Sequence, residues 1–259
     1  MLLQRAMSPA AAAWGEGMGS FKMKVAGAVA EIHPQFDSTM EYFRAYLTED
    51  EAEFTVTVTA QDREFEQQDA LREALEEGMK PRTFTEPFLE RAAIQRKFAE
   101  FLLDRDVLLF HGSTVALEGF AYIFTARCGT GKSTHTRLWR EVFPHSQMVN
   151  DDKPFLTLTP HGVVAHGSPW SGKHGLSSNI SVPLKGICIL NRGPENKIIP
   201  MAPQDAMEML LAQGYCPPES QEKFRELTEK LANSVAIWSM ECNKHREAAE
   251  VAYRAMSNI

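Results

Sequence analysis

The chain has 259 residues, of which 44% are hydrophobic, and a formal net charge of −7 from 27 basic and 34 acidic side chains. This composition is that of an ordinary globular protein and excludes a mainly disordered chain. The acidic excess excludes a broad surface for nucleic acid or anionic membranes, because such surfaces need clustered positive charge. No apolar run reaches the roughly 18 residues of a membrane-spanning helix, so we expect neither a nucleic-acid nor a membrane partner.

Cysteine usage and the N-terminal segment both favour the cytoplasm. The four cysteines form no Cys-x-x-Cys pair and no metal-type spacing with histidine. The first residues lack the long apolar region of a secretion signal, and we expect residues 1–21 to form a flexible tail. We therefore predict a cytoplasmic protein.

The next part of the chain predicts a small α+β unit. Residues 22–32 are typical of a strand. In FTVTVT, residues 54–59, apolar residues alternate with threonines, which is the pattern of a half-buried strand. The charged region 61–80 indicates a solvated helix or loop, and the apolar spacing over residues 88–103 indicates a helix.

The rest of the chain predicts a mixed α/β arrangement. Three short strands separated by glycine turns form a β-meander that leads into a glycine-rich loop, over residues 107–111, 114–118 and 120–126. Further strands are expected at 155–159, 163–166, 186–190 and 197–201. Two apolar stripes at helical spacing predict a helical C-terminus.

The strongest functional signal is ARCGTGKST, residues 126–134, between a predicted strand and a predicted helix. It fits the phosphate-binding pattern G-x-x-x-x-G-K-[ST], except that alanine replaces the first glycine. Gly129 and Gly131 allow successive N–H groups to turn inward, which creates an anion site at a helix N-terminus. Lys132 would reach the β and γ phosphates of ATP, or a bound pyrophosphate, and the Ser133 hydroxyl would bind Mg²⁺. We expect the phosphate donor to contact Arg127, Cys128, Gly129, Thr130, Gly131, Lys132, Ser133 and Thr134.

Two further features are typical of a phosphoryl-transfer site. Asp151 and Asp152 abut a predicted strand, where one carboxylate would bind Mg²⁺ and the other could accept a proton from an attacking hydroxyl. Adjacent aspartates are also common in turns, so a structural role stays open. His111 is either an ordinary core histidine or, if the meander folds back beside the strand that carries the loop, a neighbour of the phosphates.

Together these residues resemble the phosphoenolpyruvate-carboxykinase-like P-loop superfamily, and most closely the kinase domain of HPr kinase/phosphorylase. The whole chain resembles small bacterial proteins that are similar to this kinase. The matching elements follow in the same order, as His111-Gly112, Gly119, residues 126–133 and Asp151-Asp152. The resemblance implies an α/β fold with a mixed-sheet P-loop kinase core and a helical C-terminus over residues 101–259. A small α+β domain over residues 22–100 would precede it.

The resemblance also implies roles for individual residues. Ser133 and one aspartate would bind Mg²⁺, and the other aspartate would be the base that activates an acceptor hydroxyl. We assign the metal to Asp151 and the base to Asp152, although the two roles could be exchanged. His111 would support the base, and Lys132 would hold the phosphates.

The sequence gives the least information about the residues that would bind the phosphate acceptor. The chain lacks the larger substrate-binding region of the carboxykinases and an equivalent of the arginine-bearing acceptor loop of HPr kinase. In its place, residues 167–193 are rich in turn formers and polar donors, which is typical of an acceptor-binding or lid segment. Lys173 would neutralise the charge of the transferring phosphate and Trp170 would shield it from water. The alternatives are an ordinary surface loop with one buried tryptophan, and for Arg192 either a transition-state cation or a solvated side chain.

We therefore predict a Mg²⁺-dependent phosphotransferase that moves phosphate from ATP or pyrophosphate to a hydroxyl of a small molecule or a protein. The predicted catalytic residues are Asp152, His111, Lys132 and Lys173. A nucleotide-binding sensor and a bare NTPase are the alternatives, and the second carboxylate of the Asp pair favours the kinase. An oligomer is compatible with the sequence, which specifies no symmetry.

Overall fold

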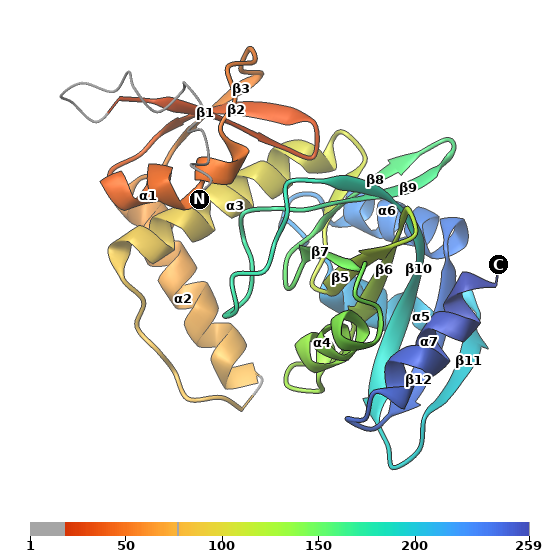
Figure 1. Ribbon diagram of the computed structural model, residues 1–259. Coiled ribbons are helices and arrows are strands. Elements are labelled where there is room, and N and C mark those ends of the chain that lie inside the picture. Colours follow the sequence, from red (N-terminus) through yellow and green to blue (C-terminus); the bar gives the residue numbers. More distant parts are fainter. Residues whose placement is uncertain (1–18, 77, 259) are drawn as a thin grey trace, which may run out of the picture.

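The computed structural model describes residues 19–76 and 78–258, which form a mixed α/β protein with two sheets (Figure 1). A three-stranded sheet has the order β1-β2-β3. A nine-stranded sheet has the order β4-β8-β9-β10-β6-β5-β7, and β12 joins it by pairing with β10 and β11. In chain order the elements are β1 (Phe21–Val25), β2 (Ala28–His33), α1 (Asp37–Tyr42), the 3-10 helix η2 (Arg44–Tyr46), β3 (Phe54–Thr57), α2 (Ala60–Glu76), α3 (Glu86–Leu103), β4 (Val107–Leu109), β5 (Ser113–Leu117), β6 (Phe120–Thr125), α4 (Lys132–Val142), β7 (Gln147–Asn150), β8 (Phe155–Thr159), β9 (Gly162–His166), β10 (Ser181–Arg192), β11 (Lys197–Met201), α5 (Pro203–Gln213), α6 (Gln221–Ser234), β12 (Ala236–Cys242) and α7 (Glu247–Ser257).

The small sheet contains the half-buried strand that the sequence predicts, and one element that it does not. Val56 and Val58 are buried, whereas Thr55, Thr57 and Thr59 are exposed, which confirms the alternation. The single strand expected over residues 22–32 is wrong, because the chain reverses at Ala26 and Gly27 into an antiparallel hairpin. Both turn residues have positive φ, 49° and 88°, which glycine adopts readily and alanine rarely.

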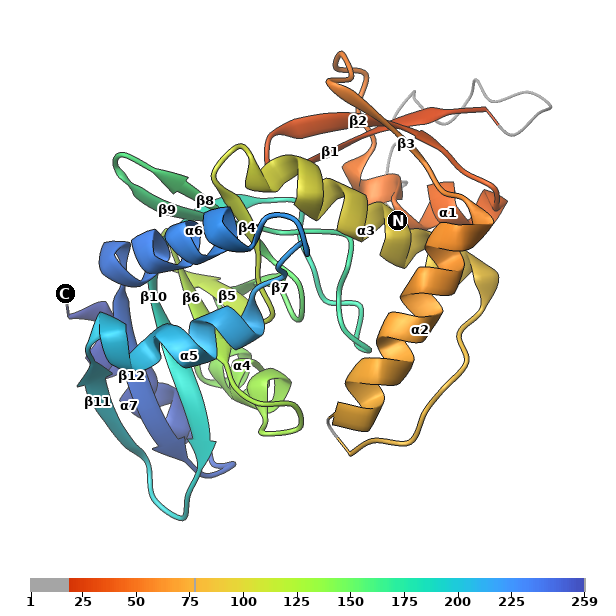
Figure 2. The ribbon, with the colours of Figure 1, turned by 180° about the vertical axis from the view of Figure 1, so that it is seen from behind.

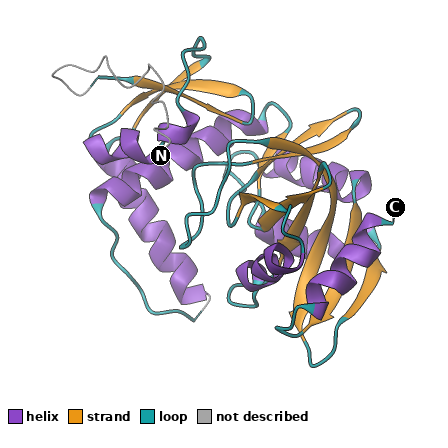
Figure 3. Ribbon diagram, viewed as in Figure 1, coloured by secondary structure: helices purple, strands orange, loops and turns teal. Residues whose placement is uncertain are grey.

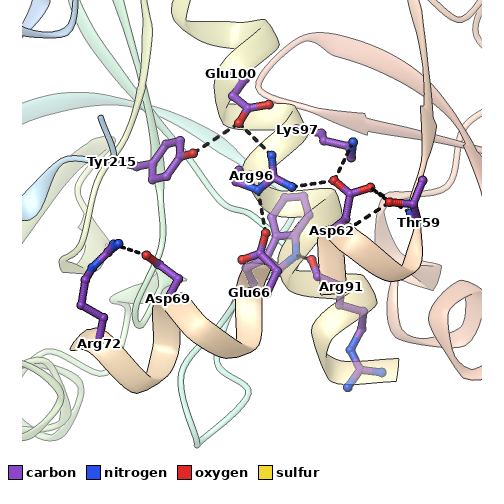
Figure 4. Close-up of polar contacts among 11 residues, drawn as sticks. Thr59, Asp62, Glu66, Asp69, Arg72, Arg91, Arg96, Lys97, Glu100 and Tyr215 are labelled. Atoms are coloured by element: carbon purple, nitrogen blue, oxygen red, sulfur yellow. Dashed lines mark hydrogen bonds and ion pairs between the residues drawn. The ribbon is translucent and has the colours of Figure 1, made fainter. Parts of the chain in front are cut away.

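The charged region after β3 is a helix, α2, and an ion network holds it against α3 (Figure 4). Arg96 on α3 contacts Asp62 at 2.8 Å and Glu66 at 2.6 Å on α2, and Glu100 at 3.0 Å on its own helix. The Tyr215 hydroxyl donates to Glu100 at 3.3 Å from the segment after α5. The network therefore joins the N-terminal helices to the C-terminal half of the chain.

Helices cover both faces of the large sheet (Figures 1 to 3). In β6, the side chains of Ala121 and Ile123 pack into the cluster that contains α5 and α6. Tyr122 and Phe124 pack into the opposite cluster, with α4 and α7. β6 lies between β10, which is parallel to it, and β5, which is antiparallel. Because both of its faces are covered, β6 is apolar along nearly its whole length.

The expected helical C-terminus is only partly right, because it contains a strand. β12 runs parallel to β10 and antiparallel to β11, between these two strands. Ile237, Trp238 and Met240 are all buried. A strand buried on both faces loses its alternation, so this segment reads from the sequence as a continuation of the preceding helical stripe.

The expected meander is also corrected. β5 and β6 form the predicted hairpin, but β4 pairs with β8 and not with either of them. β7, which the sequence analysis missed, pairs with β5 at an edge of the sheet.

The predicted domain boundaries stay predictions. Residues 1–18 of the predicted tail lie outside the described residues, and Phe21 already belongs to β1. α3 runs across the boundary expected between residues 100 and 101. Within residues 19–76 and 78–258, no helix combines the length and apolar composition that crossing a bilayer requires.

Candidate functional site

The glycine-rich loop connects the carboxyl end of β6 to the first turn of α4, as the sequence predicts. Gly129 has a φ of 72° and Gly131 a φ of 131°, and both values strain any residue with a side chain. Ala126, at the position of the missing glycine, is fully buried against the α4 side of the sheet. The Lys132 ammonium donates to the Ala126 carbonyl at 3.2 Å, so its stem folds back over the loop. Its charge therefore lies at the amino end of α4, where the helix dipole also favours an anion.

Arg192, at the end of β10, supports this loop from a neighbouring strand. Its Nε donates to the Thr130 carbonyl at 3.3 Å, and a terminal guanidinium nitrogen donates to the Gly129 carbonyl. The sequence analysis left Arg192 open between a transition-state cation and a solvated side chain. The structure shows a third role, in which Arg192 connects the loop to β10 by hydrogen bonds.

We expect Arg192→Ala to weaken binding of ATP or pyrophosphate to the loop about five- to tenfold, because the two carbonyls lose the donors that hold the loop's shape, a loss of about 1 kcal/mol. Isothermal titration calorimetry measures this. Arg246→Ala is the matched control, since Arg246 also donates to a backbone carbonyl, that of Glu141, at the other end of α4. Equal affinity in the Arg192 variant and the wild type would contradict the assigned support.

The Asp pair follows β7 and lies against the end of β4. Asp152 Oδ1 is 3.1 Å from His111 Nε2. The Gly112 amide donates to the Asp152 carbonyl at 2.9 Å. Thr125, the last residue of β6, donates its hydroxyl to the His111 carbonyl at 2.9 Å. The structure thus places His111 between the Asp pair and the strand that leads into the loop.

Lys132 lies within electrostatic reach of His111 and Asp152. Burial raises the pKa of Asp152, but the hydrogen bond from His111 and the positive charges of Lys153 and Lys132 outweigh it and bring this pKa below its usual value. Burial and the charge of Lys153 lower the pKa of His111, and Lys132 adds to this effect. At neutral pH the pair is therefore a neutral imidazole beside an ionised carboxylate.

Asp151 has different surroundings, which suit a metal ligand. It is 3% exposed, and its Oδ1 accepts the Gly172 amide at 2.6 Å. Its Oδ2 is buried without a hydrogen-bond partner among the described residues. Burial, and next the charge of Asp152, raise the pKa of Asp151. A buried carboxylate oxygen without a donor is destabilised unless a cation or proton reaches it, so its surroundings fit Mg²⁺.

A magnesium site here would need few protein ligands. Within the part of the chain that the structure describes, no three His, Cys, Asp or Glu side chains gather closely enough to hold a metal ion. Mg²⁺ usually keeps several waters and binds through one or two protein ligands and substrate phosphates. Ser133, exposed in the first turn of α4, and Asp151 would satisfy this requirement.

Of the two interpretations of Trp170, the structure matches a buried tryptophan and not a shield over the reacting phosphate. Trp170 is buried, and its indole N–H donates to the Arg91 carbonyl on α3 at 2.8 Å. Its ring packs edge-on against Phe43 and Phe155. The large apolar ring joins the core between the two sheets, which leaves no face for a substrate. Lys173, three residues later, is exposed, and its catalytic role stays a prediction.

The loop between β9 and β10 depends on a close backbone approach. A Cβ atom on Gly167 would lie 1.8 Å from the Ser178 carbonyl oxygen and 2.8 Å from that of Val149. Only glycine fits there. This approach brings the loop beside β7, so that the Gly172 amide meets Asp151.

Residues that the sequence analysis missed complete the surroundings. Asn150 accepts the amides of Asp152 and Lys153 at 2.7 and 2.6 Å, so the doublet is also a turn, as the alternative reading held. From the N-terminal unit, Arg91 lies over the Tyr42 ring at 4.5 Å. Burial raises the pKa of Tyr42, and the charges of the Asp pair add to the increase, so this phenol lies near the site. No local pattern marks such contacts, because they form between distant segments.

Comparison with known proteins adds little to this geometry. The chain matches no known protein family and no curated protein. Among solved structures, it is similar to the Hpr(Ser) kinase/phosphatase from Coxiella burnetii with 10% sequence identity and a TM-score of 0.34, over 58% of this chain and 99% of that chain. So weak a likeness decides neither the type of fold nor the activity, and the resemblance seen in the sequence stays a prediction.

Proposed function

We propose that the chain is a Mg²⁺-dependent phosphotransferase that moves phosphate from ATP or pyrophosphate to a hydroxyl of a small molecule or a protein. The observation that supports this most directly is the 3.1 Å contact between His111 Nε2 and Asp152 Oδ1 within electrostatic reach of Lys132. A sensor that only binds nucleotide would not need an ionised carboxylate held in this way.

The proposed reaction begins with the acceptor hydroxyl beside Asp152. As the hydroxyl oxygen attacks the terminal phosphorus of the donor, its proton passes to the Asp152 carboxylate, and the bond from phosphorus to the leaving oxygen breaks. His111 donates its Nε2 hydrogen to Asp152 Oδ1 and so orients the carboxylate. ADP leaves if ATP is the donor, and inorganic phosphate leaves if pyrophosphate is the donor.

The remaining residues of the proposed site would bind the donor phosphates and the metal ion and neutralise the charge of the phosphates. The backbone amides after Gly129 and the Lys132 ammonium would hold the phosphates, and Lys173 would approach from the β9–β10 loop. Ser133 and Asp151 would hold Mg²⁺, which when bound would neutralise charge on the phosphate oxygens.

A transfer screen tests the proposal. Hydroxyl-bearing metabolites and small proteins are incubated with labelled ATP or pyrophosphate, and transfer of label is measured. We expect Lys132→Ala to lower transfer by roughly 10²–10³-fold, since it removes the fixed cation at the phosphates. Lys230→Ala is the control, because Lys230 pairs with Glu226 on the surface of α6. Phosphate release without any acceptor would support a bare NTPase, and binding without turnover would support a sensor.

A further inference from the structure

A cavity of about 450 Å³ adjoins the phosphate loop, outside the group formed by His111 and the Asp pair. Its lining comes from the loop (Thr130 and Gly131), from α4, from the end of β10, and from the end of β12 with the residues that follow it. Its volume lies in the range of small-molecule sites, which run from roughly 300 to 1,000 Å³. The cavity is therefore large enough for more than a phosphate.

One continuous face of α4 leads from the phosphate loop into this cavity. Gly131, Thr134, His135 and Leu138 line it, and their spacing of three and four residues places them on the same side of the helix. Ser133, the proposed metal ligand, does not line the cavity. A phosphate chain bound at the amino end of α4 could thus extend along this face in the direction away from the metal ligand.

The lining combines an apolar surface with an unused polar group. Leu138 and Leu190 provide apolar walls. His135 is 2% exposed, and neither of its ring nitrogens has a hydrogen-bond partner among the described residues. Its ring lies 4.4 Å from that of Phe124 between centroids. Flat heteroaromatic ligands suit such a lining, because their faces are apolar and their edges carry hydrogen-bonding atoms.

We propose that this cavity holds the nucleoside end of the phosphate donor, with His135 as a hydrogen-bonding residue for the base, and that the donor is a nucleoside triphosphate and not pyrophosphate. The proposal rests on the proposed function. Pyrophosphate would occupy only the loop and leave the cavity empty. The cavity therefore determines which of the two donors this chain prefers.

The cysteines of the chain provide a direct test. Cys128 is exposed in the phosphate loop, Cys242 is half-buried in the cavity lining, and Cys216 lies outside both. The wild-type protein is alkylated with N-ethylmaleimide in the presence of ATP, GTP or pyrophosphate, and each cysteine is quantified by peptide mass spectrometry. We expect every donor that binds to protect Cys128, only a nucleotide to protect Cys242, and none to protect Cys216.

The possible outcomes separate this inference from the proposed function. Equal protection of Cys242 by pyrophosphate and by a nucleotide, or protection of Cys128 alone by all three, would overturn the nucleoside site. Failure of every donor to protect Cys128 would overturn the phosphate site itself, and the inference with it.

A variant that fills the cavity tests the same point by affinity. We expect Cys242→Phe to weaken nucleotide binding at least tenfold and to leave pyrophosphate binding unchanged. Cys216→Phe, outside the cavity and the loop, is the size-matched control and should bind both normally. An equal loss of both ligands, or no loss of nucleotide, in a folded Cys242→Phe protein would contradict the proposal. If this variant does not fold, the alkylation pattern of the wild type decides.

Discussion

Replacing Asp152 with asparagine is expected to lower phosphate transfer by roughly 10²–10⁴-fold and to change donor affinity by less than about threefold. Asparagine has nearly the same shape but cannot take the proton of the acceptor hydroxyl. Donor binding should survive, because the loop amides and Lys132 would hold the phosphates without a contribution from Asp152. Single-turnover transfer and calorimetry on the same preparation separate the two quantities. Wild-type transfer by this variant would contradict the assigned base.

Asp151→Asn is the matched comparison, because it makes the same change one residue earlier. The Oδ2 atom of Asp151 lacks a partner within the described residues, whereas Asp152 contacts His111. We therefore expect Asp151→Asn to raise the Mg²⁺ concentration needed for half-maximal transfer, with activity partly restored at high Mg²⁺. If Asp152→Asn is restored by Mg²⁺ and Asp151→Asn is not, the two roles must be exchanged.

The glycine-rich loop between β6 and α4 was predictable from the sequence because its signal is local. A strand, two glycines with positive φ, a lysine and a helix follow within a few residues, and the structure has each of them in that order. Its likeness to a nucleotide-binding loop needs no information from distant segments. The α/β character was predictable for the same reason, since apolar runs and glycine turns alternate along the chain.

The sequence analysis predicted that His111 lies close to Asp152, but the strand pairing from which it argued this was wrong. The sequence analysis placed β4 beside the strand that carries the loop. Instead β4 pairs with β8, so that Leu109 lies opposite Phe155. Beyond the strand, the Gly112 amide donates to the Asp152 carbonyl, which brings His111 beside Asp152. Strand pairing across about 50 residues depends on how whole sheets pack, and neither periodicity nor turn residues encode it.

Other features stay hidden in the sequence because distant elements create them. The cavity beside α4 forms where β10 and β12 end, and β12 itself reads as part of a helix. Tyr42 of the N-terminal unit lies within electrostatic reach of the Asp pair, and Arg91 lies over its ring, although this unit shows no motif of its own. Trp170, which the sequence left open between a shield for the phosphate and a buried side chain, belongs to the core that joins the two parts of the chain.

That assignment leads to the second large expected effect, in Trp170→Ala. The ring is 6% exposed and lies among Phe43, Phe98 and Phe155, with centroid separations of 5.5, 5.8 and 6.1 Å. Removing it leaves a large cavity between α3 and the β8 strand, which typically lowers the free energy of unfolding by about 3–5 kcal/mol. Trp170→Phe keeps most of the ring contacts and loses only the hydrogen bond to the Arg91 carbonyl, so we expect a loss of about 1–2 kcal/mol.

Denaturant unfolding of the wild type, Trp170→Ala and Trp170→Phe measures these differences in stability. The Mg²⁺ dependence of phosphate transfer shows whether the substitutions also change the geometry of the site. Trp170 lies two residues before Gly172, whose amide holds Asp151 Oδ1 at 2.6 Å. When the anchor is lost, this amide should shift, so Trp170→Ala should need more Mg²⁺ for transfer even under conditions where it stays folded, and Trp170→Phe should resemble the wild type. A tryptophan that shielded the reacting phosphate from water would behave differently, because its loss would increase hydrolysis of the donor without lowering stability by this amount. Unchanged stability together with faster hydrolysis would therefore restore the substrate role that the sequence suggested.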